Sequence, residues 1–257
     1  MTGTYEHIDV ARDGAVVTIT LDRPERRNVL ARTVLGELTA AFADAGASDA
    51  RGVILAARGP VFSAGHDFAD MVEVDLDAAR HLFRTCTDLM ETIQSIPQVV
   101  IARVHALATA AGCQLVASCD LAVAGESAGF ALPGGRGGLF CHTPAVAVAR
   151  SVGTKRALEL ALTGEVIDAA TAEAWGLVNR CVPDDELDAA VGALLGLATR
   201  GGRRSKGLGK QTFYAQIGRP QADAYALAVE VMAAATQTED AREGVSAFLD
   251  KRHPTFE

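Results

Sequence analysis

The chain has 257 residues, of which 49% are hydrophobic and 22% are charged, a composition typical of a globular protein with a sizeable core. Its net charge of −8 and the absence of a basic stripe exclude the electrostatic footprint of a nucleic-acid-binding protein. No apolar run reaches the roughly 18 residues that a membrane-spanning helix needs, and no leader-like pattern opens the sequence, so we expect a cytosolic protein without a membrane span.

Short apolar runs alternate along the chain with longer segments whose apolar residues recur every three or four positions. This pattern predicts strands alternating with helices, and an Asp13-Gly14 turn predicts a hairpin between the first two strands. The strands are expected at 8–11, 16–21, 53–57, 99–104, 121–124 and 178–182. The helices are expected at 30–45, 77–95, 110–118, 143–151, 154–162 and 168–175.

Only helices are expected after residue 185, and the Gly201-Gly202 pair is the one plausible boundary in the chain. We therefore predict an α/β core domain over residues 1–200 and a helical region over 201–257. The run 201–210 is rich in glycine and basic residues, but it lacks the preceding strand and the spacing of a phosphate-binding loop. A helix start with solvent-exposed basic residues is expected there instead.

Two segments have the features of a ligand-binding backbone. Residues 62–71, here called the first loop, are mostly small and contain Gly65, which lets a ligand approach the main chain. Residues 105–120, the second loop, follow a buried strand and open a buried helix, whose first N–H groups are unpaired and carry partial positive charge. Each segment alone is more typical of an ordinary turn or of a close-packed helix.

Taken together and in this order, the two loops resemble those of the crotonase superfamily, also called the enoyl-CoA hydratase/isomerase family. The resemblance runs nearly from end to end, and several further motifs match in register. These motifs lie at 23–28, 119–124, 162–164, 174–178 and 247–252. The resemblance implies an α/β fold with a crotonase-type ββα spiral core and a C-terminal helical region that forms homotrimers, often paired into hexamers.

The family resemblance also implies a substrate and a site. The substrate is an acyl-CoA thioester, with coenzyme A as part of the substrate and with no separate cofactor and no metal. The N–H groups of His66 and Ala111 are expected to hold the thioester oxygen as it becomes an enolate, and removing one such donor typically lowers the rate about 100- to 1,000-fold. The residues expected to bind coenzyme A are Arg26, Arg27, Ala64, Asp67, Phe248 and Lys251.

These binding residues have alternative roles. Phe248 and Lys251 come from a neighbouring subunit in the family, which agrees with the implied trimer. Asp67 is favoured as an anchor of the first loop that accepts backbone hydrogen bonds, as Asp commonly does in turns. Each basic residue, taken alone, is more typical of a solvated surface charge.

The sequence departs from the family at the two glutamates that handle water and its protons in enoyl-CoA hydratases. Their positions correspond to Gln114 and Gly134, neither of which can titrate. A general acid or base is worth roughly 100- to 10,000-fold in rate, so we expect ordinary hydration to be severely impaired. The runs 107–115 and 138–141 most resemble a subgroup of hydratase-domain-containing proteins, some of them mitochondrial.

Three side chains are candidates to replace the missing carboxylates. His142 falls in a turn that lines the acyl pocket of the family, and histidine titrates near neutral pH, so it is a candidate general acid or base. Cys141 is a less favoured candidate nucleophile, and the His66 imidazole is an alternative substrate contact besides the His66 N–H group. The chain's five cysteines lack metal-site spacing and are expected to be reduced, mostly buried thiols.

Three functions follow from this pattern. The favoured one is an enzyme that acts on an acyl-CoA through a stabilised enolate, because the two oxyanion donors are retained. The second is an acyl-CoA-binding or regulatory protein that has lost catalysis, which the missing glutamates would explain. The third is a subunit kept for assembly with active paralogues. Acyl-chain length and reaction type are not encoded in any motif of the chain.

Overall fold

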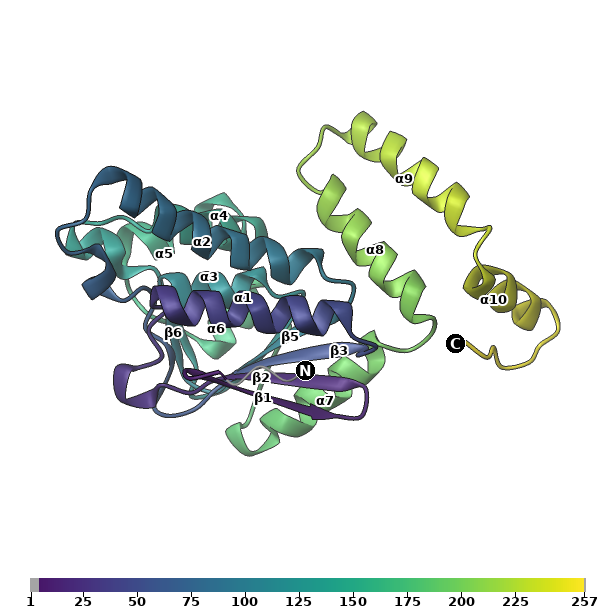
Figure 1. The fold of residues 1–257 in the computed structure, drawn as a ribbon, viewed down its shortest axis with the longest axis horizontal. Coiled ribbons are helices and arrows are strands. Elements are labelled where there is room, and N and C mark those ends of the chain that lie inside the picture. Colours follow the sequence, from purple (N-terminus) through teal and green to yellow (C-terminus); the bar gives the residue numbers. More distant parts are fainter. Residues whose placement is uncertain (1–4, 257) are drawn as a thin grey trace.

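The structure is a computed structural model that describes residues 5–256. Its strands form a six-stranded sheet in the order β1-β2-β3-β5-β7-β10 and a four-stranded sheet in the order β4-β6-β8-β9. In Figure 1, helices α1 and α2 lie above the large sheet, α7 lies below it, and α8 to α10 extend away to the right. The α/β core followed by helices, expected from the sequence, is confirmed. The domain boundary at residue 200 stays a prediction.

The elements have the following bounds. The strands are β1 (Ile8–Asp13), β2 (Val16–Leu21), β3 (Gly52–Ala57), β4 (Val61–Ser63), β5 (Val99–Val104), β6 (Leu107–Thr109), β7 (Leu121–Gly125), β8 (Gly129–Ala131), β9 (Ile167–Asp168) and β10 (Arg180–Val182). The helices are α1 (Arg32–Ala47), α2 (Leu76–Ser95), α3 (Ala111–Ser118), α4 (His142–Val152), α5 (Thr154–Thr163), α6 (Ala169–Trp175), α7 (Leu187–Ala198), α8 (Arg203–Gln216), α9 (Gln221–Ala235) and α10 (Glu239–Leu249). Short 3₁₀ turns span Pro24–Arg26, Phe68–Met71, Pro133–Gly137 and Asp184–Glu186.

The large sheet starts with the predicted hairpin. β1 and β2 pair antiparallel, and the turn between them contains Gly14 with φ +53°, a conformation that glycine adopts without strain. From β2 onward every neighbouring pair, β2–β3, β3–β5, β5–β7 and β7–β10, is parallel. Such a sheet is covered on both faces, which explains why β3 and β5 read as nearly continuous apolar runs.

The two faces of the large sheet have separate cores. The larger core lies on the side of α1 and α2, and α1 packs against β1 and β2. On the other face, Ile101 and Val123 pack against Leu187, Val191 and Leu195 of α7. This second core covers the face of the sheet opposite α1 and α2.

The four-stranded sheet was not predicted. Its strands have two or three residues each, too few to show the alternation that identifies a strand in a sequence. β4, β6 and β8 are parallel, and β9 joins β8 in antiparallel orientation. Because β4 belongs to the first loop and β6 to the second, their pairing is what brings the two loops together.

The helix expected at 30–45 starts two residues late. Leu30 is apolar, so the helical spacing of apolar residues includes it. In the structure it is buried, but its N–H donates to the Gly65 carbonyl at 2.7 Å. Leu30 and His66 form an isolated parallel β-bridge. Leu30 therefore belongs to the first loop's framework, and α1 begins at Arg32. No helix in the described part of the chain is long and apolar enough to cross a membrane.

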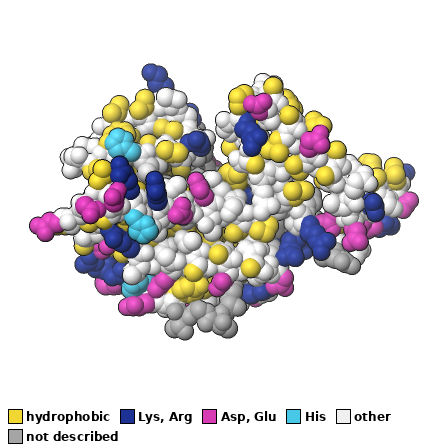
Figure 2. Space-filling view, turned by 45° about the horizontal axis from the view of Figure 1, so that its top comes forward, with side chains coloured by type: hydrophobic (Ala, Val, Ile, Leu, Met, Phe, Trp, Pro, Cys, Tyr) yellow, Lys and Arg dark blue, Asp and Glu magenta, His cyan; other side chains and the backbone are white. Residues whose placement is uncertain are grey.

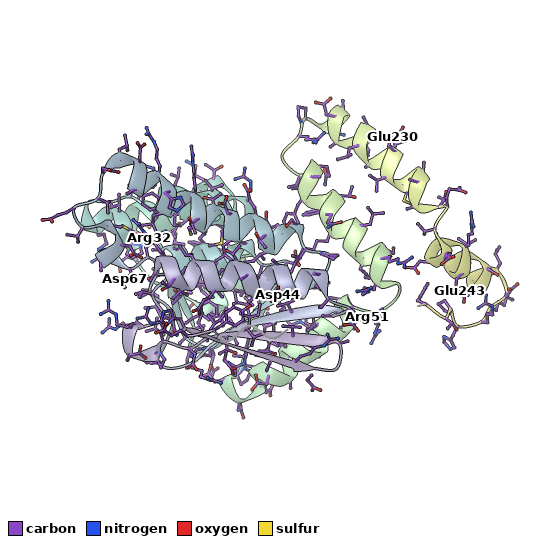
Figure 3. The ribbon with its side chains drawn as sticks, viewed as in Figure 1. Arg32, Asp44, Arg51, Asp67, Glu230 and Glu243 are labelled. Atoms are coloured by element: carbon purple, nitrogen blue, oxygen red, sulfur yellow. The ribbon has the colours of Figure 1, made fainter. Side chains whose placement is uncertain are left out.

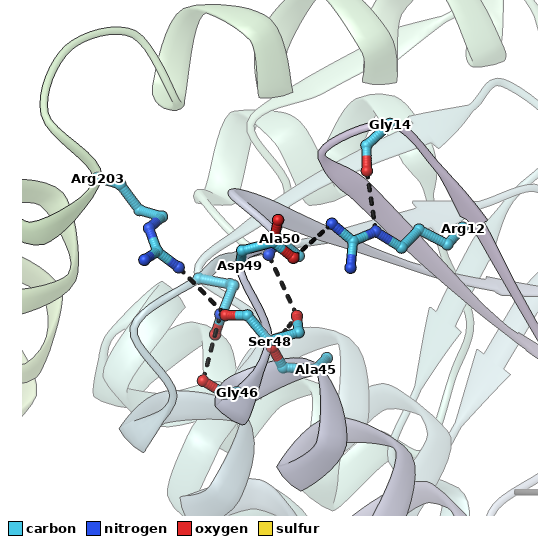
Figure 4. Close-up of polar contacts among 9 residues, drawn as sticks. Arg12, Gly14, Ala45, Gly46, Ser48, Asp49, Ala50 and Arg203 are labelled. Atoms are coloured by element: carbon cyan, nitrogen blue, oxygen red, sulfur yellow. Dashed lines mark hydrogen bonds and ion pairs between the residues drawn. The ribbon is translucent and has the colours of Figure 1, made fainter. Parts of the chain in front are cut away.

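Helices α8 to α10, residues 203–249, form a C-terminal arm that is attached to the core near the turn between α1 and β3. Arg203 donates to the Ser48 carbonyl at 3.1 Å (Figure 4). The same turn is tied to the hairpin, because Arg12 donates to Asp49 at 2.6 Å and to the Gly14 carbonyl at 2.9 Å. α8 begins at Arg203, which confirms the helix start expected for the glycine-rich basic run.

Lys210 makes the second attachment of the arm. Its ammonium group donates to the carbonyls of Ile93 and Gln98 at 2.7 and 2.8 Å and pairs with the Asp120 carboxylate at 2.7 Å. The side chains of Lys210 and Asp120 are only 7% and 13% exposed. This buried ion pair joins α8 to the end of α2 and to the loop that precedes β7.

Candidate functional site

A cavity of about 300 Å³ lies between the first loop, the start of α3, the 3₁₀ turn at Pro133–Gly137 and the start of α4. Four of the five predicted catalytic residues line it, namely His66, Ala111, Gly134 and His142. Most of the remaining wall is apolar and includes Phe83 of α2. The cavity is thus built from segments that are distant in sequence.

Asn28 fixes the base of the first loop. It is 1% exposed, and its amide group donates to the carbonyls of Arg58 and Val61 at 2.8 and 2.9 Å. Its side-chain oxygen accepts from the Arg23 N–H at 2.9 Å, and its own carbonyl accepts from Ser63 Oγ at 2.8 Å. One buried amide therefore satisfies backbone groups on both sides of the loop and holds β4 in register.

Two glycines allow the loops to approach each other. A Cβ at Gly65, where φ is +86°, would lie 3.0 Å from Ala110 Cβ and 3.2 Å from Ala111 N. A Cβ at Gly112 would lie 2.7 Å from Ser63 Cβ. A side chain at either position would push the first loop away from the start of α3. The closeness of the two loops therefore depends on these two residues.

The close approach brings together two N–H groups that have no acceptor. Ala111 is the first residue of α3, a position whose N–H has no partner within the helix. Among the hydrogen bonds of residues 5–256, none uses the backbone N–H of His66 or of Ala111. Both residues line the cavity. These are the two donors that the sequence predicted for an oxyanion, and the helix end adds positive potential beside them.

Ala110, which precedes α3, has a strained backbone. Its φ of 49° and ψ of −117° are rare for a residue with a side chain, and its N–H donates to the Ala131 carbonyl at 2.9 Å. Such conformations cost about 1–3 kcal/mol and persist only where the surroundings enforce them, commonly at functional sites. Here the strain turns the chain from β6 into α3 directly beside the cavity.

The two positions expected to replace the family's glutamates differ in their surroundings. Gln114 is buried in α3, 4% exposed, and it is not among the residues that line the cavity. Its side-chain oxygen has no partner among the described residues. Gly134 does line the cavity, but a Cβ there would overlap the Leu139 carbonyl and lie 2.8 Å from the Cys141 sulfur. The backbone at Gly134 therefore has no room for a side chain.

Cys141 and His142 stand at the start of α4. The Cys141 thiol is buried and accepts the Gly134 N–H at 3.3 Å, and burial raises the pKa of this thiol, which disfavours the thiolate. His142 is exposed, and its ring lies 5.1 Å from that of Phe140. His142 is thus at the open side of the cavity, where a general acid or base would be in contact with solvent.

His66 is a half-buried titratable residue that also lines the cavity. Its ring packs edge-on against Phe83 with the centroids 5.4 Å apart. Both ring nitrogens are buried and have no hydrogen-bond partner in the described part of the chain. Burial lowers the pKa of this imidazole, while the Leu30 carbonyl and Asp70 oppose part of that shift. The ring is therefore neutral at pH 7.

Four residues predicted to bind coenzyme A lie together beside the cavity. Ala64 lines it, and the Ala64 N–H donates to the Arg27 carbonyl at 3.0 Å. Arg26 pairs with Asp67 at 3.1 Å. Asp67 also accepts the Ala69 N–H at 3.0 Å, and this hydrogen bond, followed by the Arg26 cation, lowers the pKa of the carboxyl. Asp67 thus anchors the first loop, as the turn chemistry predicted.

The other two predicted binding residues are not brought to this cavity within one chain. Phe248 is in α10, where its side chain is 82% exposed, and Lys251 follows that helix. In Figure 3, Asp67 is at one end of the molecule and Glu243 of α10 is at the other. A role for Phe248 and Lys251 at a cavity of this kind therefore requires a second subunit.

Sequence reasoning missed Phe83 and Phe140, which line the cavity. Phe83 is one of several apolar residues at helical spacing in α2. Its position is that of an ordinary core residue, so nothing in the sequence marks it as a cavity residue. Four of the five cysteines are buried, as expected, and all five thiols are free. Residues 5–256 contain no group of three or more His, Cys, Asp or Glu side chains that could hold a metal ion.

Known proteins resemble the chain over nearly its whole length. The mouse protein "Enoyl-CoA hydratase domain-containing protein 3, mitochondrial" is 41% identical over 247 residues, which are 95% of this chain and 82% of the mouse protein. A crystal structure of enoyl-CoA hydratase from Mycobacterium smegmatis has a TM-score of 0.94 and 45% identity, and covers 97% of this chain and 98% of its own. The human enoyl-CoA hydratase domain-containing protein 3 has a TM-score of 0.93 and 40% identity, with coverage of 97% and 100%.

These matches correct one expectation. The mouse relative carries the word mitochondrial in its name, as do its counterparts in rat and human. The expectation of a cytosolic protein was therefore wrong. The physical reason is that it rested only on the absence of a leader-like pattern, and a globular composition with no membrane span does not distinguish one aqueous compartment from another.

The similarity to the hydratase-domain-containing subgroup, expected from the runs 107–115 and 138–141, is confirmed by the mouse and human matches. The crotonase-type fold is confirmed as well, because the hydratase structures superpose on almost every residue of the chain. The sequence pattern of the enoyl-CoA hydratase/isomerase family matches residues 11–257. The chain therefore belongs to the enoyl-CoA hydratase/isomerase family.

Proposed function

We propose that the chain is an enzyme that binds an acyl-CoA thioester in the cavity and stabilises the enolate formed from its thioester carbonyl. The observation that carries this proposal is the pair of backbone N–H groups of His66 and Ala111, which are unpaired and come from two cavity-lining residues. Gly65 permits their approach. An oxygen that becomes negatively charged gains more from two fixed donors than a neutral carbonyl does, so the donors favour the reaction's enolate.

The N-terminus of α3 also stabilises the negatively charged enolate oxygen. Its N-terminus carries partial positive charge, and the cavity wall around it is mostly apolar, so the local dielectric constant is low. Each donor is worth about 100- to 1,000-fold in rate in comparable sites. Holding the enolate allows a proton at the α-carbon to leave and return, which is the step shared by hydration and isomerisation.

The coenzyme A part of the ligand is proposed to lie beside Arg26 and Arg27, whose positive charges suit its phosphates. Phe248 and Lys251 of a neighbouring subunit complete this site in the proposed trimer. Exposed apolar side chains on the C-terminal arm support such an assembly (Figure 2), because a monomer rarely exposes so many of them together. They include Phe213, Ile217, Tyr225, Val229, Met232 and Phe248.

Ordinary hydration is expected to be weak. The residues that line the cavity include no carboxylate, since Gly134 has no side chain and Gln114 is buried behind the wall. Hydration needs a group that takes a proton from water and one that gives a proton to the α-carbon. His142 at the open side is our candidate for one of these roles. A reaction that needs only the enolate and one proton carrier fits the cavity better.

The test compares two glycine variants. Gly65→Ala places a Cβ against Ala110 and Ala111, whereas Gly14→Ala introduces the same kind of positive-φ strain with nothing within 4 Å. Exchange of the α-proton of butyryl-CoA for deuterium reports enolate formation directly. We expect Gly65→Ala to reduce the exchange rate at least about 100-fold, with Gly14→Ala near the wild-type rate. Equal rates in all three proteins would contradict the oxyanion site.

The absence of a cavity-lining carboxylate favours a second candidate function, that of an acyl-CoA-binding protein without turnover. Calorimetry with butyryl-CoA separates the two. Binding together with α-proton exchange identifies an enzyme, and binding without exchange identifies a binding protein. If the wild-type protein shows neither binding nor exchange, both functions are excluded.

A further inference from the structure

Lys251 lies in the turn that ends α10, in a backbone conformation that a side chain disfavours. Two hydrogen bonds close this turn in the pattern of a Schellman motif. The Arg252 N–H donates to the Ala247 carbonyl at 3.0 Å, and the Lys251 N–H donates to the Phe248 carbonyl at 3.2 Å. The left-handed position of this motif is usually glycine, but here it is Lys251, with φ +54°. The lysine is therefore retained where glycine would make the turn more stable.

No contact within the described chain accounts for this lysine. The side chain of Lys251 is exposed, and its ammonium group takes part in no ion pair among residues 5–256. Strained backbone conformations persist where the surroundings enforce them, and they are common at functional sites. A cation that is held in place and left unpaired is suited to an anionic group that lies outside its own chain.

Glu243, labelled on α10 in Figure 3, holds this turn in place. Its carboxylate accepts two hydrogen bonds from the Arg252 guanidinium, at 2.6 and 2.8 Å, and one from the Thr255 N–H at 2.8 Å. The Arg252 hydrogen bonds, followed by that of the Thr255 N–H, lower the pKa of the Glu243 carboxyl to about 2, so this group is charged at neutral pH. One side chain of α10 thus fixes the residues that follow Lys251.

The ion pair between Glu243 and Arg252 replaces the contact that usually accompanies such a turn. In a Schellman motif, the residue after the left-handed position commonly packs an apolar side chain against the third residue from the helix end. In this chain those two residues are Arg252 and Ala247, and the Arg252 side chain binds Glu243 instead. A bidentate pair is directional, so it sets the orientation of the turn. The direction in which Lys251 extends should therefore depend on Glu243.

We propose that Glu243 is a positioning residue, which binds Arg252 and thereby orients Lys251 toward the coenzyme A phosphates of a ligand held by the neighbouring subunit. This inference rests on the proposed function, in which Phe248 and Lys251 complete the site of another subunit. A cation that is already oriented loses less conformational freedom on binding than a mobile one, so the ligand gains affinity. The negative charge of Glu243 by itself repels phosphates. Its effect through Lys251 and its direct effect therefore have opposite signs.

Calorimetry with butyryl-CoA measures that sign. Glu243→Gln keeps the shape of the side chain and removes the charge that holds Arg252. We expect it to bind butyryl-CoA about 3- to 10-fold more weakly than the wild type, whereas the loss of a repelling charge alone would strengthen binding. Glu239→Gln, an exposed position in the first turn of the same helix, is the matched control and should bind within about twofold of the wild type. Unchanged or tighter binding in Glu243→Gln would overturn the proposal.

Two further measurements separate positioning from a merely structural role. S-Butyryl-pantetheine carries the same thioester without the phosphates, and we expect Glu243→Gln to bind it as the wild type does. In a double-mutant cycle, Glu243→Gln should weaken butyryl-CoA binding no further once Lys251→Met has removed the ammonium group. An equal loss with both ligands, or additive losses in the cycle, would show that Glu243 does not act through Lys251.

Variants of the turn itself complete the test. Lys251→Gly should raise the melting temperature, because glycine relieves the left-handed backbone, and should weaken butyryl-CoA binding about 10-fold. Arg252→Lys keeps the charge but loses the bidentate pair, so it should reproduce part of the Glu243→Gln effect if that variant does not fold.

Light scattering should give the same oligomer for the wild type and for Glu243→Gln. A loss of affinity that accompanies dissociation would assign Glu243 to assembly and overturn the positioning role. If the wild type binds butyryl-CoA and Glu243→Gln binds it equally well, only this inference fails. If the wild type does not bind butyryl-CoA at all, the proposed function fails as well.

Discussion

Lys210→Met tests how the C-terminal arm is held to the core. The substitution keeps the length of the side chain and removes its charge, and thereby deletes two hydrogen bonds to the carbonyls of Ile93 and Gln98 together with the ion pair to Asp120. Breaking a buried ion pair by removing one partner costs about 3–5 kcal/mol, because the other charge stays buried and uncompensated. We expect a loss of that size in the free energy of unfolding.

The loss in the free energy of unfolding is expected to be large because Lys210→Met leaves the Asp120 carboxyl group buried without its partner. Asp120 is already difficult to ionise, since burial raises its pKa even though Lys210 and the Val100 N–H oppose the shift. Burial also lowers the pKa of Lys210. Lys210 and Asp120 therefore stabilise each other's charged forms against the effect of burial. Replacing both, in Asp120→Asn with Lys210→Met, should recover part of the stability that the single substitution loses.

Urea denaturation followed by circular dichroism measures the effect. Lys206→Met, on the same helix but exposed, is the matched control and should change stability by less than about 0.5 kcal/mol. Hydrogen exchange at the amides of α8 adds a local measurement, with protection lost there before it is lost in the large sheet. A change below about 1 kcal/mol for Lys210→Met would refute the view that this pair anchors the arm.

Three further predictions concern the cavity. Ala110→Gly should raise the free energy of unfolding by about 1 kcal/mol in urea denaturation, because glycine adopts the φ of 49° without strain. Gly134→Ala should lower it by about 1–3 kcal/mol through overlap with the Leu139 carbonyl, and no change would show that the turn can move. Because burial lowers the pKa of His66 below 6.5, stability should fall as the pH drops below that value, and His66→Leu should flatten this slope.

The predictable parts of the fold are those in which apolar residues recur regularly along one continuous segment of the sequence. The hairpin was identified by alternation around Gly14, and α2 by the helical spacing of apolar residues over 77–95, close to the observed Leu76–Ser95. The small sheet was not predictable, because pairs such as Val61 with Leu107 join residues far apart in the sequence in strands of two or three residues. Leu30 shows the same limit, since its apolar side chain fits a helix start as well as the β-bridge that it forms.

The candidate site was predictable where the backbone pattern itself is the signal. Gly65 and the start of a buried helix, expected at residue 110 and observed at Ala111, can both be recognised in the sequence, and the structure brings them together. The burial of the His66 ring was not readable, because it depends on Phe83 in another element. The arm that carries Phe248 extends away from the rest of its own chain (Figure 1), which agrees with the family resemblance that places Phe248 in a neighbouring subunit.

At Gly134, one of the two positions expected to replace the family's glutamates, the backbone itself leaves no room for a side chain. A side chain at Gly134 would overlap the Leu139 carbonyl. The backbone N–H of Gly134 already donates to the Cys141 sulfur. Restoring a carboxylate there would require residues 139–141 to move, and with them the start of α4 and His142. The single substitution Gly134→Glu is therefore expected to disturb the wall of the cavity. We therefore propose that the cavity acts through the His66 and Ala111 N–H groups, with the His142 side chain at its open side.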